Sequence, residues 1–293
     1  MTEGQIFQAA HVWIEVALNG PWGRERQPRI PLTVGEIVAD GIACAQAGCA
    51  IVHVHAYDES SGRQRDDWET YARIIEGIRA RVDAIVYPTI PLSGSSRFAH
   101  VEELARRGLI EWTVLDPGSV NFARFGAIAA HAEGFVYENS LGEISDGMRV
   151  VRQYGLHPGY AIYEPGFTRL GAALAAAPPP CPTPIYRFMF SDEFAWGFPP
   201  KPAYADAHLA LLDETAPGAP WMVAGLGVDI RPLIPHALAR GGHVRVGLED
   251  APWGSRLSNV EWVREALAAV RSFGAEPASA AAVRAALSPG ALG

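Results

Sequence analysis

The amino-acid sequence predicts an α/β fold, a single (β/α)8 TIM barrel over residues 1–293 with a peripheral helical tail over 275–293. Apolar runs of strand length alternate with longer segments of helical periodicity, which is typical of βα units around a parallel sheet. About eight such units follow one another in the chain, and a closed barrel contains eight. The length of 293 residues fits one barrel, because barrels of about 250 residues commonly form a single domain.

The first βα unit carries the clearest local signals. A strand is predicted over residues 12–18, and it ends at the turn sequence Asn19-Gly20-Pro21. Thr33 and Glu36 have the spacing of a capping box, in which each side chain accepts a hydrogen bond from the other residue's backbone. We therefore expect a helix from Thr33 to about Gly48.

The remaining units continue the same alternation. A strand over 50–56 precedes a helix over 66–81. The Pro-rich segment 176–184 is interpreted as a long loop and not a domain boundary, because the strand pattern resumes after it. A terminal helix over 278–287 is expected outside the barrel. The other predicted strands are 84–89, 112–115, 160–163, 185–190, 221–224 and 243–247.

The amino-acid composition excludes several classes of protein function. The hydrophobic fraction of 49% supplies a sizeable core, which excludes a disordered chain. A net charge of −8 argues against partners such as nucleic acid or a membrane surface, because both require a basic surface. Lys201 is the only lysine and lies in a Pro-rich loop, so a Schiff-base aldolase is not expected. Small molecules are the predicted partners.

Cysteine spacing and the N-terminal sequence set the expected environment. Cys44, Cys49 and Cys181 show no CxxC spacing, so neither a disulfide framework nor a cysteine zinc site is predicted. Residues 1–10 lack the basic segment and apolar run of a targeting signal, and the chain has no apolar stretch long enough to span a membrane. We expect a cytoplasmic protein.

Two histidines near the end of the second predicted strand are candidate metal ligands. In Ile51-Val52-His53-Val54-His55, the period of two places His53 and His55 on one face. Both imidazoles then point into the barrel mouth. One interpretation is that one histidine packs and the other caps a loop. A pair on one face at a strand end favours chelation of an ion, which requires at least one more protein ligand.

The last predicted strand supplies that ligand. Arg245 and Glu249 share a face, and Asp250 begins the following loop. Because the first, second and eighth strands of a closed barrel are close together, Glu249 can complete a His/His/Glu site with an open coordination position. The alternative is that Arg245, Glu249 and Asp250 form a solvated ion-pair cluster. Gly225-Leu226-Gly227, after the seventh strand, is at most permissive for phosphate binding, because a tight turn explains it equally well.

These residues together resemble the β-keto acid cleavage enzymes, a family typified by 3-keto-5-aminohexanoate cleavage enzyme. The resemblance extends over residues 12–274. It is carried by Ala17-Leu18-Asn19-Gly20, by Ala47-Gly48 with the following His53-Val54-His55, and by the run Gly241-Gly242-His243-Val244-Arg245-Val246-Gly247-Leu248-Glu249-Asp250.

The resemblance implies a zinc-containing barrel, usually a homotetramer, that converts a β-keto acid and acetyl-CoA into acetoacetate and a new CoA ester. Acetyl-CoA is then the implied co-substrate. By position, His53, His55 and Glu249 match the family's zinc ligands, Arg245 and Asp250 match its catalytic arginine and aspartate, Thr89 falls on a substrate-facing serine and Asp116 on a substrate-facing asparagine.

The sequence also departs from the family pattern around the substrate. Two acids of the substrate shell are replaced by Trp22 and Ala161. Three further differences are Thr89-Ile90-Pro91-Leu92 in place of a Ser-Thr-Gly-Gly turn, Val114 in place of a threonine, and Ala251 in place of an asparagine.

The replacements change the expected substrate. Glu15 and Glu164 are nearby acids that can compensate for the missing ones, although Glu15 is equally interpretable as a structural charge inside the barrel. Trp22 and Val114, with Trp196 or Phe198, are expected to present apolar surface. This pocket favours a keto acid with a neutral, bulkier side chain over a cationic one.

The mechanism implied is a condensation followed by retro-Claisen cleavage. Zinc would chelate the keto oxygen and the carboxylate, Asp250 would act as general base, and Arg245 would orient it. The alternatives are a zinc-dependent hydrolase on a similar barrel, a non-haem iron oxygenase with the same ligand types, and a degenerate family member that binds a metabolite. The βα alternation opposes the oxygenase, and the position of the histidine pair on the second strand opposes the hydrolase.

Overall fold

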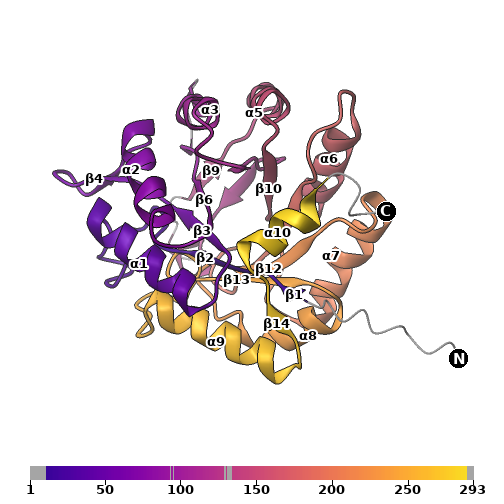
Figure 1. Cartoon of the computed structure of the whole chain (residues 1–293). Helices are drawn as coiled ribbons and strands as arrows, with labels where there is room; N and C mark the ends of the chain where they lie inside the picture. Colours follow the sequence, from indigo (N-terminus) through magenta and orange to yellow (C-terminus); the bar gives the residue numbers. More distant parts are fainter. Residues whose placement is uncertain (1–10, 93, 95, 129, 131–133, 289–293) are drawn as a thin grey trace, which may run out of the picture.

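Eight parallel strands form one sheet that curls into a ring, with helices around the outside (Figure 1). This computed structural model describes residues 11–288 except 93, 95, 129 and 131–133. The strand order around the ring is β6-β3-β2-β13-β12-β11-β10-β7. Their bounds are β2 Ile14–Ala17, β3 Ile51–Val54, β6 Ile85–Pro88, β7 Trp112–Val114, β10 His157–Ile162, β11 Ile185–Phe190, β12 Trp221–Gly225 and β13 His243–Val246.

The ring is nearly closed. Each strand pairs in parallel with its neighbour from β6 round to β7. At the seam β6 and β7 lie in contact, and within the described part of the chain no ladder of hydrogen bonds joins them. Each of the eight predicted strands overlaps one of these strands, so the prediction of a (β/α)8 barrel is confirmed.

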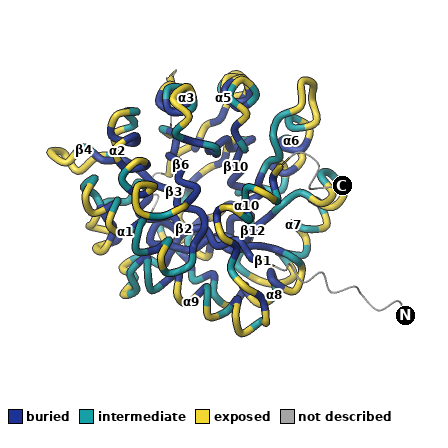
Figure 2. The backbone as a smooth tube through the Cα atoms, viewed as in Figure 1, coloured by how far each residue is buried: buried dark blue, intermediate teal, exposed yellow. Residues whose placement is uncertain are grey.

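Helices cover the outside of the ring, with exposed outer faces and buried strands between them (Figure 2). The helix predicted from Thr33 is α1: Thr33 Oγ1 accepts from Glu36 N at 3.2 Å, and Glu36 Oε2 accepts from Thr33 N at 3.0 Å. The helices are α1 Val34–Ala47, α2 Trp68–Arg79, α3 Ala99–Arg106, α4 Phe125–Ile128, α5 Leu141–Tyr154, α6 Pro165–Ala176, α7 Pro202–Thr215, the 3-10 turn η1 Arg231–Leu233, α8 Ile234–Ala239, α9 Asn259–Ser272 and α10 Ala280–Leu287.

Two small antiparallel hairpins extend the loops after strands β3 and β7. They are β4 Tyr57–Asp58 with β5 Arg63–Gln64, and β8 Val120–Phe122 with β9 Phe135–Tyr137. Neither was predicted, because strands of two or three residues are too short to show a period of two. Both hairpins lie at the carboxyl end of the ring and contribute to the site described below.

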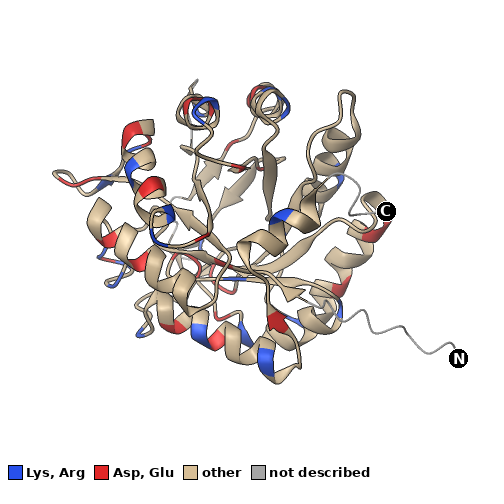
Figure 3. Cartoon of the chain, viewed as in Figure 1, with Lys and Arg blue, Asp and Glu red and all other residues tan. Residues whose placement is uncertain are grey.

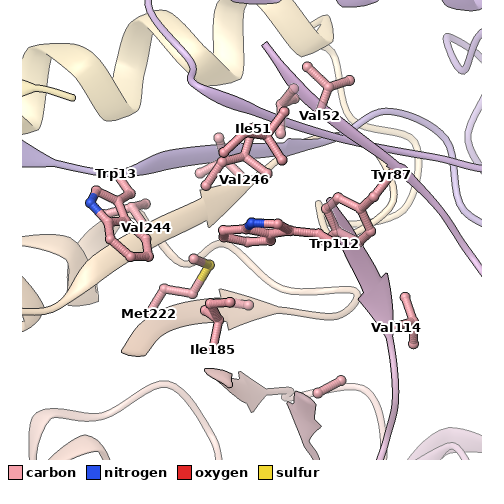
Figure 4. Close-up of a cluster of buried hydrophobic side chains, with 14 of the residues drawn as sticks. Trp13, Ile51, Val52, Tyr87, Trp112, Val114, Ile185, Met222, Val244 and Val246 are labelled. Atoms are coloured by element: carbon pink, nitrogen blue, oxygen red, sulfur yellow. The ribbon is translucent and has the colours of Figure 1, made fainter. Parts of the chain in front are cut away.

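Aromatic side chains fill the amino-terminal end of the ring (Figure 4). The rings of Trp13 and Trp112 lie 6.2 Å apart between centroids, and His243 stacks on Trp13 at 4.2 Å. Met222 is fully buried in the same layer. The barrel is therefore filled with side chains at its amino-terminal end and is not an open channel, as is usual for this fold.

The C-terminal segment covers this packed end. Strand β14 (Glu276–Pro277) pairs with β1 (His11–Val12), and α10 lies across the middle of the ring in Figure 1. Arg284 of α10 binds Asp83 and Glu111, each at 2.8 Å, just before strands β6 and β7. The tail thus lies outside the ring of strands, and the carboxyl end stays open.

The outer helices carry charges of both signs. Figure 3 shows acidic and basic residues interspersed along α3, α5 and α9. A separate set of charged side chains is buried inside the ring: Glu15, Asp116, Arg187, Arg245, Glu249 and Asp250. Among the residues described by the structure, no helix is both long and apolar enough to cross a membrane.

Candidate metal centre and active site

A cavity of about 390 Å³ opens at the carboxyl end of the barrel strands. Its volume falls in the range of small-molecule sites, and its place is where barrels of this type carry their active sites. Side chains from β3, β6, β7, β10, β11 and β13 or the loops after them reach it. The predicted site residues that line it are Trp22, His53, His55, Thr89, Asp116, Arg245 and Glu249.

His53, His55 and Glu249 converge on one point of this cavity. Alternation along β3 turns both histidines inward, as predicted. The Nε2 atom of His53 lies 3.6 Å from Glu249 Oε2, and that of His55 lies 3.5 Å from Glu249 Oε1. One ligand atom from each of the three residues lies within 4.8 Å of the others.

A glycine places Glu249 there. Gly247 follows β13 with φ 133°, and a Cβ atom on it would lie 2.2 Å from the carbonyl oxygen of Ala17. Only glycine fits, because both the backbone angle and the close approach exclude a side chain. The turn lets Glu249 N donate to Ala17 O at 3.2 Å, and Trp22 Nε1 donates to Glu249 O at 2.8 Å.

The three residues suit a metal ion because they contain buried polar atoms without partners. His53 Nδ1, His55 Nε2 and Glu249 Oε2 accept or donate no hydrogen bond among the described residues. Such atoms are rare because each costs about 1–3 kcal/mol. Two imidazoles and a carboxylate are also the ligand types that zinc and other first-row metals bind.

His53 and Glu249 have the protonation states that a metal ligand requires, a neutral imidazole and an ionised carboxylate. Burial, assisted by the charge of Arg245, holds the pKa of His53 well below its usual value, so this ring is neutral. Burial raises the pKa of Glu249, but the positive charges of His55 and Arg245 outweigh it and leave the pKa below its usual range. For His55 burial is likewise outweighed, because the Glu249 carboxylate raises the pKa. A proton therefore competes with a metal at His55 as the pH falls.

Arg245 and Asp250 form a bidentate ion pair beside the metal ligands. Arg245 Nε lies 2.8 Å from Asp250 Oδ2, and its Nη2 lies 2.9 Å from Oδ1. Arg245 Nη2 also lies 3.2 Å from Glu249 Oε1. Burial raises the pKa of Asp250 to about 6 against the opposing effect of Arg245. This is a suitable range for a general base near neutral pH. Arg245 lines the cavity, whereas Asp250 lies behind it.

Glu15 lies beneath the cavity and does not line it. Its Oε1 atom accepts from the Tyr87 hydroxyl and from the guanidinium groups of Arg245 and Arg187, at 3.1 and 3.2 Å for the two arginines. These are the contacts of a structural charge inside the barrel, the interpretation that the sequence left open beside substrate binding. Glu164 also stays outside the cavity lining, and its Oε1 accepts from Gly197 N at 3.1 Å.

Asp116 and Thr89 both reach the cavity, but their polar atoms are largely engaged. Asp116 Oδ1 accepts from Ala161 N at 2.7 Å, and Oδ2 accepts from the Tyr137 hydroxyl at 2.8 Å. Burial raises the pKa of Asp116. The carbonyl oxygen of Thr89 accepts from His100 Nε2 at 2.8 Å. These contacts fix both residues at the cavity wall.

The rest of the wall is mainly apolar, and the second hairpin supplies much of it. Trp196 and Phe198, expected there from the sequence, do not line the cavity. Trp196 lies behind the wall, with its ring 5.7 Å from Phe122 and 4.9 Å from Tyr163. The residues that take this role are Val114, Phe122, Phe135, Ala161, Tyr163 and Met189.

Sequence reasoning missed several polar residues of the cavity, which include Glu25 and Arg26 of the loop after β2 as well as Arg187, Gln64 and Tyr137. Arg187 stands alone as a charge in the otherwise apolar strand Ile-Tyr-Arg-Phe-Met-Phe, a signal that was available. Gly159 makes room for it, because a Cβ atom there would lie 2.2 Å from Arg187 Nη2. Gln64 and Tyr137 lie on the unpredicted hairpins, and no pattern pointed to them.

Comparisons with known proteins identify the family of the chain. A family model described as beta-keto acid cleavage enzyme matches residues 11–288. The 3-keto-5-aminohexanoate cleavage enzyme of Fusobacterium nucleatum is 26% identical over 95% of this chain and 96% of its own length. The 3-oxoadipate:acetyl-CoA acetyltransferase of Cupriavidus necator is 27% identical over 94% of this chain and 93% of its own.

Solved structures show the same fold. The apo structure of ObcA matches with a TM-score of 0.69 at 16% identity, and the match covers 89% of this chain but only 65% of that protein. The 3-dehydroquinate dehydratase from Geobacillus kaustophilus matches with a TM-score of 0.54 at 12% identity, over 89% of this chain and 92% of that one.

Proposed function

Because the chain belongs to the beta-keto acid cleavage enzyme family, we propose that it condenses a β-keto acid with acetyl-CoA and cleaves the product to acetoacetate and a new acyl-CoA, with zinc as its metal. The observation that carries the proposal is the convergence of His53, His55 and Glu249, whose ligand atoms lie within 4.8 Å of one another, beside the Arg245–Asp250 pair. The relative named 3-oxoadipate:acetyl-CoA acetyltransferase supports acetyl-CoA as co-substrate.

The chain's own residues account for the proton transfer. Zinc held by His53, His55 and Glu249 would polarise the keto oxygen as a Lewis acid. We assign the role of general base to Asp250, which lies directly behind Arg245 at the cavity wall and would take a proton from the carbon between the keto group and the carboxylate of the substrate. Arg245 holds both oxygens of Asp250 and so directs the remaining lone pairs of that carboxylate.

The reaction then forms one carbon–carbon bond and breaks another. The deprotonated carbon bonds to the thioester carbon of acetyl-CoA, and the CoA thiolate leaves. The thiolate next attacks the original keto carbon, and the bond between this carbon and the deprotonated carbon breaks. Acyl-CoA and acetoacetate result, and Asp250 returns its proton to the acetoacetate carbon. The same carboxylate thus serves as base and then as acid.

The apolar wall supports a keto acid with a neutral side chain. Trp22 and Ala161 stand at positions where the family resemblance places acids, and both line the cavity beside Val114 and Phe122. The two Asp116 oxygens already accept hydrogen bonds. Glu25 also lines the cavity, but it is exposed to solvent, which screens its charge. Burying an ammonium group here without a partner would cost several kcal/mol. Cationic keto acids are therefore expected to be poor substrates.

The metal prediction is tested on the purified protein. We expect about one zinc per chain by elemental analysis, and formation of acetoacetate from a panel of β-keto acids only when acetyl-CoA is present. His53→Ala should lose the metal and the activity, since two ligands hold zinc poorly. Product release without acetyl-CoA would instead identify a metal-dependent hydrolase. A metal-free and active wild type would refute the zinc site, and metal binding without turnover would indicate a metabolite-binding protein.

The substrate prediction is tested with a matched pair, a 5-amino β-keto acid and its alkyl isostere of equal size. We expect a higher kcat/KM for the alkyl compound, by tenfold or more. A preference for the amine would reject the neutral pocket and would point to Asp116 or Glu25 as the acid that receives the cation. A homotetramer and a cytoplasmic location stay predictions.

A further inference from the structure

A chain of hydrogen bonds leads away from His55 on the side of the ring opposite its metal-facing nitrogen. His55 Nδ1 lies 2.8 Å from Gln64 Oε1. Gln64 Nε2 donates to both oxygens of Asp66, at 3.0 and 2.8 Å. The hydroxyl of Tyr71 donates to Asp66 Oδ1 at 2.8 Å. The chain is continuous from the ring of His55 to helix α2.

The chemistry of these groups fixes the direction of each bond. An ionised carboxylate only accepts hydrogen bonds, so the amide NH₂ group of Gln64 must face Asp66. The amide oxygen of Gln64 then faces His55, and Nδ1 of His55 must carry the proton. In the neutral ring that a metal requires, His55 Nε2 then carries the lone pair, and this nitrogen is one of the buried atoms without a partner at the candidate metal centre.

The backbone holds these residues rigidly. Gln64 lies on β5, where it is the pairing partner of Tyr57 on β4. Asp66 directly precedes Asp67, the residue that caps α2 by accepting from Thr70 N at 3.0 Å. Tyr71 lies in the first turns of that helix and is fully buried. The hairpin and the helix start therefore place the amide of Gln64 without help from a bound ligand.

We infer that Gln64, oriented by Asp66 and Tyr71, is a positioning residue that fixes the tautomer and ring orientation of His55 and so raises the protein's affinity for its metal. The inference rests on the proposed metal site. Partners of this kind typically change metal affinity by 10- to 100-fold. Gln64 acts through His55 and is not itself a ligand in this assignment.

The test measures Zn²⁺ affinity of the metal-free full chain by competition with a chromophoric chelator. Gln64→Leu removes the acceptor at nearly constant volume and should weaken Zn²⁺ binding about 10- to 100-fold. The double variant Gln64→Glu/Asp66→Asn keeps an acceptor for Nδ1–H, because the amide introduced at position 66 can donate to the new carboxylate, and it should stay within about threefold of wild type. Asp66→Asn allows the Gln64 amide to turn and should weaken binding by a smaller factor. Arg63→Leu changes the neighbouring exposed residue of the same strand and serves as the control.

Each outcome decides the inference. Wild-type affinity in Gln64→Leu overturns it, as does an equal loss in Gln64→Leu and in the double variant Gln64→Glu/Asp66→Asn, because the side chain would then only pack. If Gln64→Leu does not fold, unchanged affinity in Asp66→Asn overturns it. If the folded wild type binds no Zn²⁺, the proposed metal site fails first and the positioning role fails with it. Melting temperatures of the metal-free variants separate loss of affinity from loss of structure.

Discussion

Glu249 and Asp250 are sequence neighbours whose acidities are shifted in opposite directions. Glu249 faces two imidazoles and Arg245, which together lower its pKa despite burial. Asp250 faces Arg245 but lies near the negative charges of Glu249 and Glu15, and burial raises its pKa to about 6. Two carboxylates with separated pKa values are typical of sites that divide their roles. Glu249 is suited to bind a cation and Asp250 to exchange a proton.

Replacement of Asp250 tests this division. Asp250→Asn removes the base but leaves Arg245 paired with Glu15 and Glu249, so we expect the fold and zinc content to persist. Turnover should fall by about two orders of magnitude or more, on the order of 3 kcal/mol. The measurement is kcat with the best β-keto acid, with zinc content determined on the same sample. Turnover within about a factor of three of wild type would show that Asp250 is not the base.

At the scale of the element, reciprocal caps fix where three of the four longest described helices begin, and only α7 lacks one. The capping box of Thr33 and Glu36 starts α1, and those of Ser140 with Glu143 and Ser258 with Glu261 start α5 and α9. In each box the glutamate accepts from the backbone N–H of the cap residue. The same local solution recurs because the first N–H groups of any helix lack partners within the helix.

The cap of α1 predicts a specific pH dependence. The backbone N–H groups of Thr33 and Leu32, with Arg24, lower the pKa of Glu36 to about 2. A lowered pKa in the folded state means that this contribution is complete above the usual pKa near 4.5 and is lost as the pH falls toward 2. Glu36→Gln should therefore destabilise the protein at pH 7 by less than about 1 kcal/mol, because the partly exposed pair is screened.

The measurement is urea unfolding of wild type and Glu36→Gln at pH 7 and at a series of pH values down to 3. The difference in free energy of unfolding should shrink as the pH falls below 4.5. Glu214→Gln, at an exposed position of α7, serves as the control and should show no such trend. A difference that grows in acid would contradict the assigned sign.

The barrel strands were predictable because alternation and burial act over four to six residues in most of them. His53 and His55 followed from the same rule, since a period of two decides which side chains enter the barrel. The hairpins β4–β5 and β8–β9 were not predictable, because strands of two or three residues are too short to show a period of two. Gln64, Phe122, Phe135 and Tyr137 therefore entered the site only with the structure.

At the scale of the molecule, the two ends of the barrel have different tasks. The amino-terminal end is packed with Trp13, Trp112 and Met222 and covered by α10. The carboxyl end holds the cavity, where buried polar atoms without partners are available to bind a ligand. Barrels commonly separate stability from function in this way. A ligand at the carboxyl end should then add to the stability that the packed end provides.

This addition is measurable by metal removal. His53 on β3 and Glu249 after β13 are far apart in the sequence. Because only folding brings them together, an ion between them binds only the folded chain. At a free Zn²⁺ concentration of about 100 times Kd, linkage contributes about 2.7 kcal/mol of stability. For a chain of this size each kcal/mol shifts Tm by roughly 2–4 °C, so removal of the metal by a chelator should lower Tm by roughly 5–10 °C.

The measurement is Tm of the wild type after chelation and after Zn²⁺ is restored. His53→Ala is the matched control, and its Tm should respond to neither treatment because the ligand set is broken. A wild-type Tm that is equal with and without the metal, at saturating Zn²⁺, would contradict a site formed only by the folded barrel.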